Sequence, residues 1–348
     1  MSREPGKSLV SVVIPAYNCA RYVGEAVESV LAQTYQNWEI VVVDSSSDGT
    51  KDVLRPFMGR LTYLYQAPRG VAAARNAGIT GASGEFVAFL DADDAWMPGF
   101  LECGIRALNR YPTAALAFSN GYRTDPHGRT LRPLLPTEPE AFWGWIGKYG
   151  NLASGVVEGH WYGQLLMRNF VHTSSVTVRK ACLDGTGGFD EGLSYGDDYD
   201  LWLQLARRNK FVFVNAPLAT YRLHAEGLSG SDSVRGDRWE QEHVKIRERE
   251  LGHVPPELRR MLRRRIAASY WRLGWVQFHR NQLQGARPMF RRCLHYEKLH
   301  WRAWAYAAAS FLPGKGVEAI RGIRRWRRGV LSRLSRSSGT SGCWPRSW

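Results

Sequence analysis

The chain has 348 residues, of which 44% are hydrophobic and 42 are aromatic, so it can bury a large core and is not a disordered protein. Its net charge of +15 is uneven: from Pro255 onward 21 Lys and Arg face three acids, a local charge of +18, which leaves −3 for residues 1–254. The five cysteines form no CxxC pair, which argues against a disulfide framework or a zinc site. Without a visible signal peptide or membrane span, we expect a soluble or peripheral protein.

Two β-branched strands open the chain. The first, residues 9–14, is stopped by Pro15-Ala16-Tyr17-Asn18, with Asn18 placed to cap a following amphipathic helix. The second, residues 38–44, ends on Asp44. Two strands joined by a helix form a right-handed parallel unit, so we expect the two strand tips to lie side by side.

A loop and a helix of small residues follow at positions 68–78. Small side chains let a helix approach a sheet closely, and Arg75, one turn into this helix, would point its guanidinium toward the strand tips, where phosphates could bind. A surface arginine on a packing helix is an equally good interpretation from spacing alone.

The next strand, residues 85–90, is fully apolar and ends on Asp91-Ala92-Asp93-Asp94. Carboxylates crowded at a strand end repel one another unless a cation neutralises them, and all-oxygen ligands suit Mg²⁺ or Mn²⁺. The alternative is a strand-to-helix turn in which Asp93 or Asp94 serves as an N-cap.

A second acidic cluster, Gly196-Asp197-Asp198-Tyr199-Asp200, precedes a helical stretch. The helix dipole favours negative charge at this position, but capping explains one or two acids and not three. A carboxylate held here could act as a general base and accept a proton.

Taken together, these motifs resemble the family 2 glycosyltransferases, inverting enzymes with the GT-A fold. The resemblance covers roughly residues 9–230 and rests on the order PAYN, VVVDSSSDGT, RGVAAARNAG, GEFVAFLDADD, GGFDEGLSYGDDYDLWLQLA and YRLH. It implies an α/β fold with a Rossmann-like, mostly parallel central sheet flanked by helices, followed here by a C-terminal α-helical extension.

The resemblance also implies roles for individual residues. The base and ribose of a nucleotide-diphosphate sugar, with UDP as the expected nucleotide, would contact Pro15, Ala16, Tyr17, Asn18 and Asp44. Donor binding would continue at Asp91, which would hold the ribose, and at the adjacent Ala92. The metal, Mg²⁺ or Mn²⁺, would bind Asp93 and bridge the diphosphate, with Arg75 and His224 as further contacts.

Two departures from the family pattern affect these assignments. The loop after the second strand is one residue shorter than the usual VDDGSTDGT, which leaves Asp44 as the best candidate to meet the base. The family's catalytic base corresponds to Asp198, and Asp197 replaces the usual glutamate and remains an alternative base. Residues 172–175 are expected on a strand that borders the acceptor side.

Beyond about residue 231 the sequence predicts helices rich in arginine. Gly274, Ala286, Phe290 and Cys293 fall at the packing positions of a tetratricopeptide-like hairpin, and residues 301–312 predict an apolar helix. Residues 317–330 combine apolar side chains at helical spacing with arginines, as in a helix lying in a membrane interface. We expect a catalytic domain at 1–235, a basic helical region at 236–334 and a disordered tail at 335–348.

The sequence therefore predicts a metal-dependent inverting glycosyltransferase of cell-surface polysaccharide or glycolipid synthesis, with a glycan or lipid-linked acceptor. We expect it in the cytoplasm, peripheral on the inner face of the cell membrane, where the basic C-terminal helices would bind anionic lipid. The alternatives are a nucleotidyltransferase-like sugar-nucleotide enzyme and a non-catalytic membrane or RNA adaptor on the same fold. No nucleic acid partner is expected, because the tail lacks a recognisable reading module.

Overall fold

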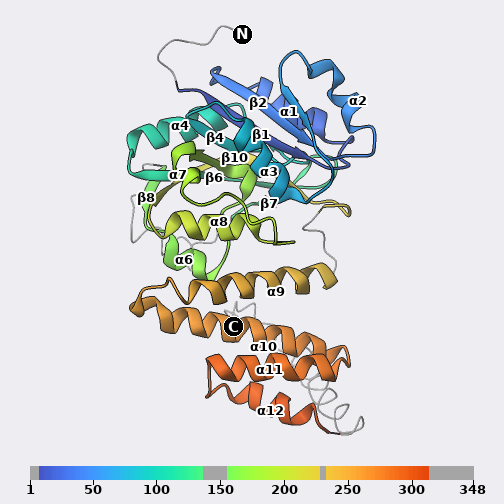
Figure 1. Ribbon diagram of the computed structural model, residues 1–348, viewed down its shortest axis with the longest axis vertical. Helices are drawn as coiled ribbons and strands as arrows, with labels where there is room; N and C mark the ends of the chain where they lie inside the picture. The colour runs from blue at the N-terminus through green and yellow to red at the C-terminus, as the bar shows by residue number, and fades with distance from the viewer. Residues whose placement is uncertain (1–7, 136–154, 228–232, 313–348) are drawn as a thin grey trace, which may run out of the picture. The chain divides into compact units, whose positions relative to one another are not determined.

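The computed structural model describes residues 8–135, 155–227 and 233–312 (Figure 1). The chain divides into two compact units, residues 1–246 and 247–348. The expected amphipathic helix at 317–330 and the expected tail at 335–348 lie outside the described residues.

The first unit is built on one sheet in the order β3-β2-β1-β4-β9-β6-β10-β5, with β7 paired to β6 and β8 paired to β10. The strands are β1 Val10–Ala16, β2 Trp38–Asp44, β3 Thr62–Tyr65, β4 Phe86–Phe89, β5 Ala95–Trp96, β6 Ala114–Thr124, β7 Thr130–Pro133, β8 Val156–Gly159, β9 Val176–Arg179 and β10 Lys210–Arg222. Its helices are α1 Val23–Leu31, α2 Thr50–Leu54, η1 Arg55–Phe57, α3 Val71–Gly81, α4 Phe100–Arg110, α6 Tyr162–Met167, η3 Thr173–Ser175, α7 Lys180–Asp184 and α8 Asp197–Ala206.

Among the described residues, four of the seven strand pairs along the main path of the sheet run parallel. The run β3-β2-β1-β4 is parallel throughout, and β6 pairs parallel with β10. Strand β9 is inserted antiparallel between β4 and β6. The mostly parallel α/β sheet flanked by helices is as predicted, and it places the carboxyl ends of β1, β2 and β4 at one edge, where ligands bind in such sheets.

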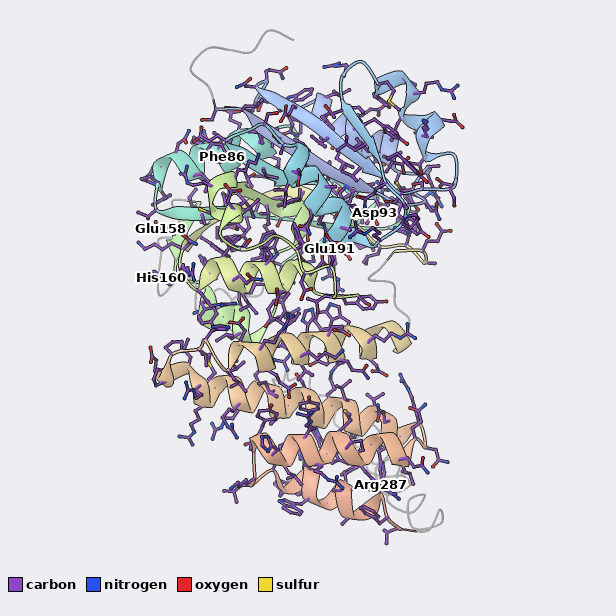
Figure 2. All side chains as sticks on the ribbon, viewed as in Figure 1. Phe86, Asp93, Glu158, His160, Glu191 and Arg287 are labelled. Atoms are coloured by element: carbon purple, nitrogen blue, oxygen red, sulfur yellow. The ribbon has the colours of Figure 1, made fainter. Side chains whose placement is uncertain are left out.

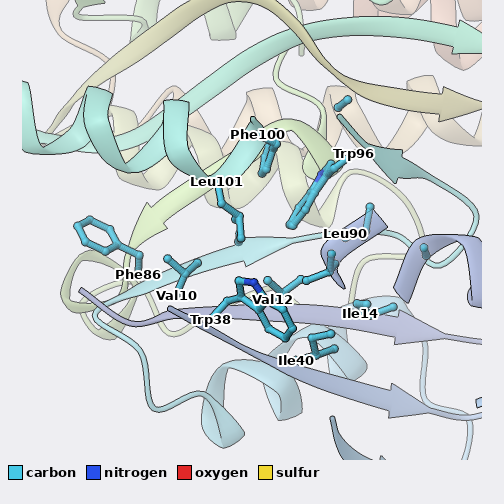
Figure 3. Packing of buried hydrophobic residues seen from close by; sticks show 14 of the residues in the cluster. Val10, Val12, Ile14, Trp38, Ile40, Phe86, Leu90, Trp96, Phe100 and Leu101 are labelled. Atoms are coloured by element: carbon cyan, nitrogen blue, oxygen red, sulfur yellow. The ribbon is translucent and has the colours of Figure 1, made fainter. Parts of the chain in front are cut away.

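Both faces of the sheet are covered, which explains why its strands are continuous apolar runs. Val12 and Ile14 of β1 belong to the core cluster that includes the buried residues of α1 and α4. Figure 3 shows this face, with Val10 and Phe86 at one end of their strands and Ile14 and Leu90 at the other. The small-residue helix α3 packs on the opposite face. It lies so close to β1 that a methyl group added to Gly78 would come within 2.2 Å of Val13.

Three local predictions are wrong. Thr173–Ser175 forms a 3-10 turn before β9 and not a strand. The sequence favours a short strand at residues 211–214 that is ended by the turn Asn215-Ala216-Pro217. Strand β10 instead continues to Arg222, because two register shifts absorb this segment without ending the ladder. Asn18 does not cap α1, which begins at Val23; its backbone is in the left-handed region at φ 48°.

The second unit is helical. Helix α9 (Ser233–Glu250) runs from the first unit into the second and is followed by α10 (Pro256–His279), α11 (Leu283–Tyr296) and α12 (Trp301–Ala309). Ala286, Phe290 and Cys293 are fully buried, and Phe290 lies against Gly274. Ala286 and Phe290 belong to the same hydrophobic cluster, so three of the four residues that suggested a helical hairpin pack together. Among the described residues, no helix is both long enough and apolar enough to span a bilayer.

Candidate functional site

The tips of β1 and β2 are joined by a network of polar contacts. The Asn18 amide donates to Ser46 Oγ at 2.8 Å, and Asn18 Oδ1 accepts from the Ser47 amide at 2.9 Å. Asp44 is buried; its two carboxylate oxygens accept from the Ser46 amide and from the Tyr63 hydroxyl at 2.7 Å. These loops therefore hold each other in place, and Asp44 fixes the backbone of the Ser45–Ser47 loop.

The remaining residues of the first strand tip differ in exposure. Pro15 and Ala16 are buried in the last positions of β1, while the ring of Tyr17 is 63% exposed. An exposed aromatic ring at the carboxyl edge of a parallel sheet offers a flat surface on which a nucleobase could stack.

The carboxylates after β4 have three different environments. Asp91 is partly exposed and accepts from Arg75 at 2.7 Å, while Ala92 beside it is buried. Asp93, labelled in Figure 2, contacts His224, with Oδ2 at 2.9 Å from Nε2. Asp94 is buried and accepts from Ser174 Oγ and from the Arg222 amide, and burial, with the nearby Asp93 and Asp91, raises its pKa well above the ordinary value. Asp94 thus anchors the turn, and Asp93 faces the site.

Arg75 connects the two acidic clusters. Its guanidinium is 5% exposed and donates to Asp91 at 2.7 Å and to Asp197 at 2.6 Å. Burial alone would lower the pKa of Arg75, yet the two carboxylates raise it above its ordinary value. As expected, Arg75 reaches the strand tip, but there it forms a buried clamp between two carboxylates that lie 106 residues apart in the chain. Because Asp197 is the first residue of α8 and Asp91 lies in the turn after β4, the clamp fixes the start of the helix against the end of the strand.

Asp198 follows Asp197 in the second acidic cluster, and its hydrogen-bond partners are residues other than Arg75. Its Oδ2 accepts from Thr173 Oγ1 at 3.1 Å, and Asn169 Nδ2 lies 3.4 Å from both carboxylate oxygens. Burial, together with the adjacent Asp197, raises the pKa of Asp198 to about 6. The arrangement holds a carboxylate that takes up and releases a proton near neutral pH.

The position of these acids depends on the start of α8. Gly196, which precedes the helix, has φ +80°, and a methyl group there would meet the His243 ring at 2.9 Å. The His243 ring in turn stacks on Tyr199 with centroids 4.6 Å apart. Glycine is therefore required at this turn both for its backbone conformation and for the close approach of α9.

The loop before α8 is fixed to α3 by one amide side chain. Asn76 Oδ1 accepts from the Phe189 amide at 2.8 Å, and its Nδ2 donates to the Phe189 carbonyl at 2.9 Å. Glu191, also labelled in Figure 2, accepts from Asn76 and pairs with Arg69 at 2.8 Å. The loop before α8 is thus held by the same helix that carries Arg75.

Asp93 and His224 form a pair that fits a divalent cation. Their two donor atoms, 2.9 Å apart, are spaced like adjacent ligands of an octahedral ion with metal–ligand distances of about 2.1 Å. His224 Nδ1 is buried and has no partner within the described residues. No third His, Cys, Asp or Glu joins the pair in the described ranges, so the diphosphate and water would complete the coordination.

Several site residues were missed from the sequence. Ser174 contacts both Asp94 and the Asp91 amide, and Arg222 donates to the Asp93 carbonyl at 2.9 Å. Asn169 and Thr173, the partners of Asp198, were missed as well. They lie at least 25 residues from the acids they contact, so spacing along the chain gave no signal.

Comparison with known proteins places this site in a family. The model of glycosyl transferase family 2 matches residues 11–159. An uncharacterised glycosyltransferase of Rickettsia typhi is 30% identical over 226 residues, which cover 64% of this chain and 67% of the relative. The chain belongs to glycosyltransferase family 2. A Rickettsia prowazekii glycosyltransferase is 31% identical over 62% of this chain, but the match spans only 64% of that relative's length.

Solved structures share the fold of this chain. Staphylococcus aureus TarS 1-349 in complex with UDP-GlcNAc has a TM-score of 0.61 at 16% identity, over 91% of this chain and 92% of that one. The mannosyltransferase PcManGT of Pyrobaculum calidifontis, in complex with GDP-Man and Mn²⁺, has a TM-score of 0.55 at 20% identity, over 93% and 85%. At these identities the likeness confirms the predicted GT-A fold of the family 2 chain.

Proposed function

We propose that this family 2 enzyme transfers a sugar from a nucleotide-diphosphate donor to a glycan or lipid-linked acceptor, with inversion at the anomeric carbon. The observation that carries the proposal is the Arg75 clamp, which holds the donor-side Asp91 and the acceptor-side Asp197 against one guanidinium. One side of the clamp carries the Asp93–His224 pair and the other carries Asp198. A site with separate donor and acceptor ends is what a transfer reaction requires, because proximity of the two reactants supplies much of the rate.

The arrangement favours Asp198 over Asp197 as the general base. Asp197 Oδ2 is engaged by Arg75 at 2.6 Å, and a carboxylate that neutralises a buried guanidinium is a weak proton acceptor. Asp198 accepts hydrogen bonds from neutral donors, namely the Thr173 hydroxyl, the Asn169 side-chain amide and the Tyr199 backbone amide, and its pKa of about 6 suits a base near neutral pH. In the proposed step the acceptor hydroxyl oxygen forms a bond to the anomeric carbon from the face opposite the diphosphate, Asp198 takes the hydroxyl proton, and the nucleoside diphosphate leaves with the bonding electrons.

Asp93 and His224 would hold Mg²⁺ or Mn²⁺ at the diphosphate. When bound, the ion would neutralise the negative charge that grows on the leaving group. Tyr17 and Asn18 would line the base and ribose pocket, with Asp44 fixing the loop beneath it and Asp91, next to Ala92, meeting the ribose. A UDP-sugar is the first donor to test, since TarS binds UDP-GlcNAc, and a GDP-sugar is the second, since PcManGT binds GDP-Man.

A thermal-shift screen of nucleotide sugars with and without Mn²⁺ tests the donor. A ligand that binds only the folded state raises the unfolding midpoint by mass action, by about 2.7 kcal/mol of apparent stability at one hundred times its Kd. We expect a shift that depends on both the sugar nucleotide and Mn²⁺, followed by slow donor hydrolysis. Absence of any metal-dependent shift across UDP-, GDP-, ADP- and CMP-sugars would refute the donor assignment.

We further propose that the helical unit docks on an anionic membrane face, where a lipid-linked acceptor for cell-surface polysaccharide or glycolipid synthesis would lie. Its last described segment exposes large apolar side chains: Leu299 is 92% exposed, Trp301 70% and Phe311 67%. Arginines lie against these rings, with the Arg287 guanidinium 4.2 Å from the Phe311 ring centroid. Exposed aromatic rings next to cationic groups suit the interface of an anionic bilayer.

Liposome flotation tests this docking. The full chain, a double variant Trp301→Ser/Trp304→Ser and a chain ending at Tyr296 are compared on neutral vesicles and on vesicles with anionic lipid. We expect binding by the full chain only with anionic lipid and low salt, and weaker binding by the other two. Equal flotation of all three, or no effect of anionic lipid, would refute the membrane assignment.

A further inference from the structure

Three arginines gather on the edge of the sheet beyond the catalytic acids, and we refer to Arg123, Arg132 and Arg168 as the arginine cluster. Arg123 of β6 lies directly opposite Arg132 of β7 in the antiparallel pair. Arg168 follows α6 and precedes Asn169, which contacts Asp198. In the part of the chain that the structure describes, none of the three side chains forms an ion pair or a hydrogen bond. A nearby contrast is Arg129, which is neutralised by Asp125 at 2.7 Å in the same β6–β7 hairpin.

The arginine cluster is unfavourable for the folded chain by itself. Like charges placed directly opposite on neighbouring strands destabilise a sheet. Burial, and then the charges of Arg132 and Arg168, lower the pKa of Arg123. The pKa of His172 is lowered as well: burial and the charges of Arg123 and Arg168 bring it to about 3, so the ring is neutral near pH 7. Three cations that have no carboxylate partner among the described residues leave a local field that an anion would neutralise.

Aromatic and imidazole groups complete the surroundings of the cluster. The Arg123 guanidinium lies 5.7 Å from the Tyr221 ring centroid, and the His172 and Tyr221 rings are 5.1 Å apart. Tyr221 of β10 is also opposite Arg123 in the sheet register. A guanidinium held against an aromatic face is restricted in orientation, which reduces the entropy lost when it binds an oxyanion.

The cluster borders the acceptor end of the proposed site. Arg168 and His172 are the chain neighbours of Asn169 and Thr173, the two side chains that contact Asp198. The donor end is instead served by the Asp93–His224 pair. An anion at the cluster would therefore lie next to the hydroxyl that Asp198 deprotonates.

We infer that the acceptor is anionic, and that the arginine cluster binds a phosphate or carboxylate group carried by the acceptor glycan close to its reactive hydroxyl. This inference rests on the proposed function and specifies its substrate class. Guanidinium forks bind both oxyanions through paired, charge-assisted hydrogen bonds. The cluster would thereby select charged acceptors over neutral glycans of the same length and place the hydroxyl by anchoring its neighbour.

Binding to three matched probes tests the inference: cellotetraose, its C6-oxidised form cellotetrauronate and 6-phosphorylated cellotetraose. The full chain is titrated with each probe in the presence of saturating UDP and Mn²⁺, so that the donor pocket is filled. We expect one or both charged probes to bind about tenfold or more tightly than cellotetraose, with an affinity that falls as salt is added. The tighter of the two charged probes identifies the anion as phosphate or carboxylate.

The double variant Arg123→Gln/Arg168→Gln should lose most of this preference, at least about tenfold. Arg129→Gln removes a charge from the same hairpin and should keep the wild-type preference. Because the cluster arginines repel one another, Arg123→Gln should keep or raise the unfolding midpoint, whereas a purely structural role predicts a lower one.

The outcomes separate failure of this inference from failure of the proposed function. Charged probes that bind no better than cellotetraose, in a protein that hydrolyses a nucleotide sugar, overturn the inference and leave the proposed function standing. A double variant that loses affinity for UDP as strongly as for the charged probe assigns the cluster to the donor pocket and also overturns it. Absence of both donor binding and donor hydrolysis in the wild type refutes the proposed function itself.

Discussion

Replacing Arg75 by glutamine tests the clamp between the two ends of the site. The substitution removes a guanidinium that is 5% exposed and leaves two carboxylates, with side chains 27% and 8% exposed, without their cation. Removing one partner of a buried ion pair costs about 3–5 kcal/mol, because the remaining charge stays buried. For a unit of roughly 150–250 residues, each kcal/mol lowers the unfolding midpoint by about 2–4 °C, so we expect a fall of about 6–20 °C.

The same substitution should change the pH dependence of the reaction. Arg75 opposes the rise in the pKa of Asp198 that burial and Asp197 cause. In Arg75→Gln, Asp197 and Asp198 are adjacent acids without a cation, and they are expected to share a proton to a higher pH. The base must be ionised to act, so the acid limb of the rate profile, which we expect near pH 6 in the wild type, should move to higher pH.

Calorimetry, which can separate the transitions of the two units, and donor turnover between pH 4.5 and 9 provide the measurements. Arg75→Gln/Asp197→Asn is the informative control, because neutralising one orphaned carboxylate should recover part of the stability and return the acid limb toward its original position. An Arg75→Gln protein that unfolds within about 2 °C of the wild type, with an unshifted acid limb, would show that the clamp neither stabilises the fold nor holds down the pKa of Asp198.

The other predictions concern single side chains of the site. Asp93→Ala should abolish Mn²⁺-dependent donor binding in titration calorimetry, whereas the exposed Asp184→Ala should not; unchanged affinity would remove Asp93 from the metal site. Asp198→Asn should retain donor binding while turnover falls by about 10² to 10⁴; if Asp197→Asn is the inactive variant instead, Asp197 is the base. Gly196→Ala should cost about 1–3 kcal/mol from its positive φ and its contact with His243, while Gly185→Ala, where a methyl group meets nothing within 4 Å, should be close to neutral in the same melting assay.

The strand tips could be predicted because at each tip an apolar run gives way to polar or acidic residues within a short stretch. An apolar run that stops at Asp91 and Asp93 signals both the strand and the ligand edge, and the sheet arrangement brings the tips of β1, β2 and β4 together as expected. The small residues around Gly78 likewise predicted the close packing of α3.

The partners of these residues were not predictable, since their positions depend on packing between distant elements. Asp94 was a candidate helix cap and is a buried anchor, because the Ser174 hydroxyl of η3 and the Arg222 amide of β10 supply its hydrogen bonds. Asn18 is a residue type that often caps helices. Here its backbone amide and its side-chain oxygen instead form hydrogen bonds with Ser46 and Ser47. The arginine cluster carries no recognisable motif, as its members come from β6, β7 and the end of α6.

The large chain separations inside the site constrain the order in which it can form during synthesis. Arg75 and Asp197 are 122 residues apart, and Asp93 and His224 are 131 apart. A nascent chain that has emerged only as far as residue 159 contains the whole segment matched by the family model and yet neither of these pairs. Because contacts between distant segments form slowly and only after both have emerged, catalytic competence would arise late, when β10 joins the sheet.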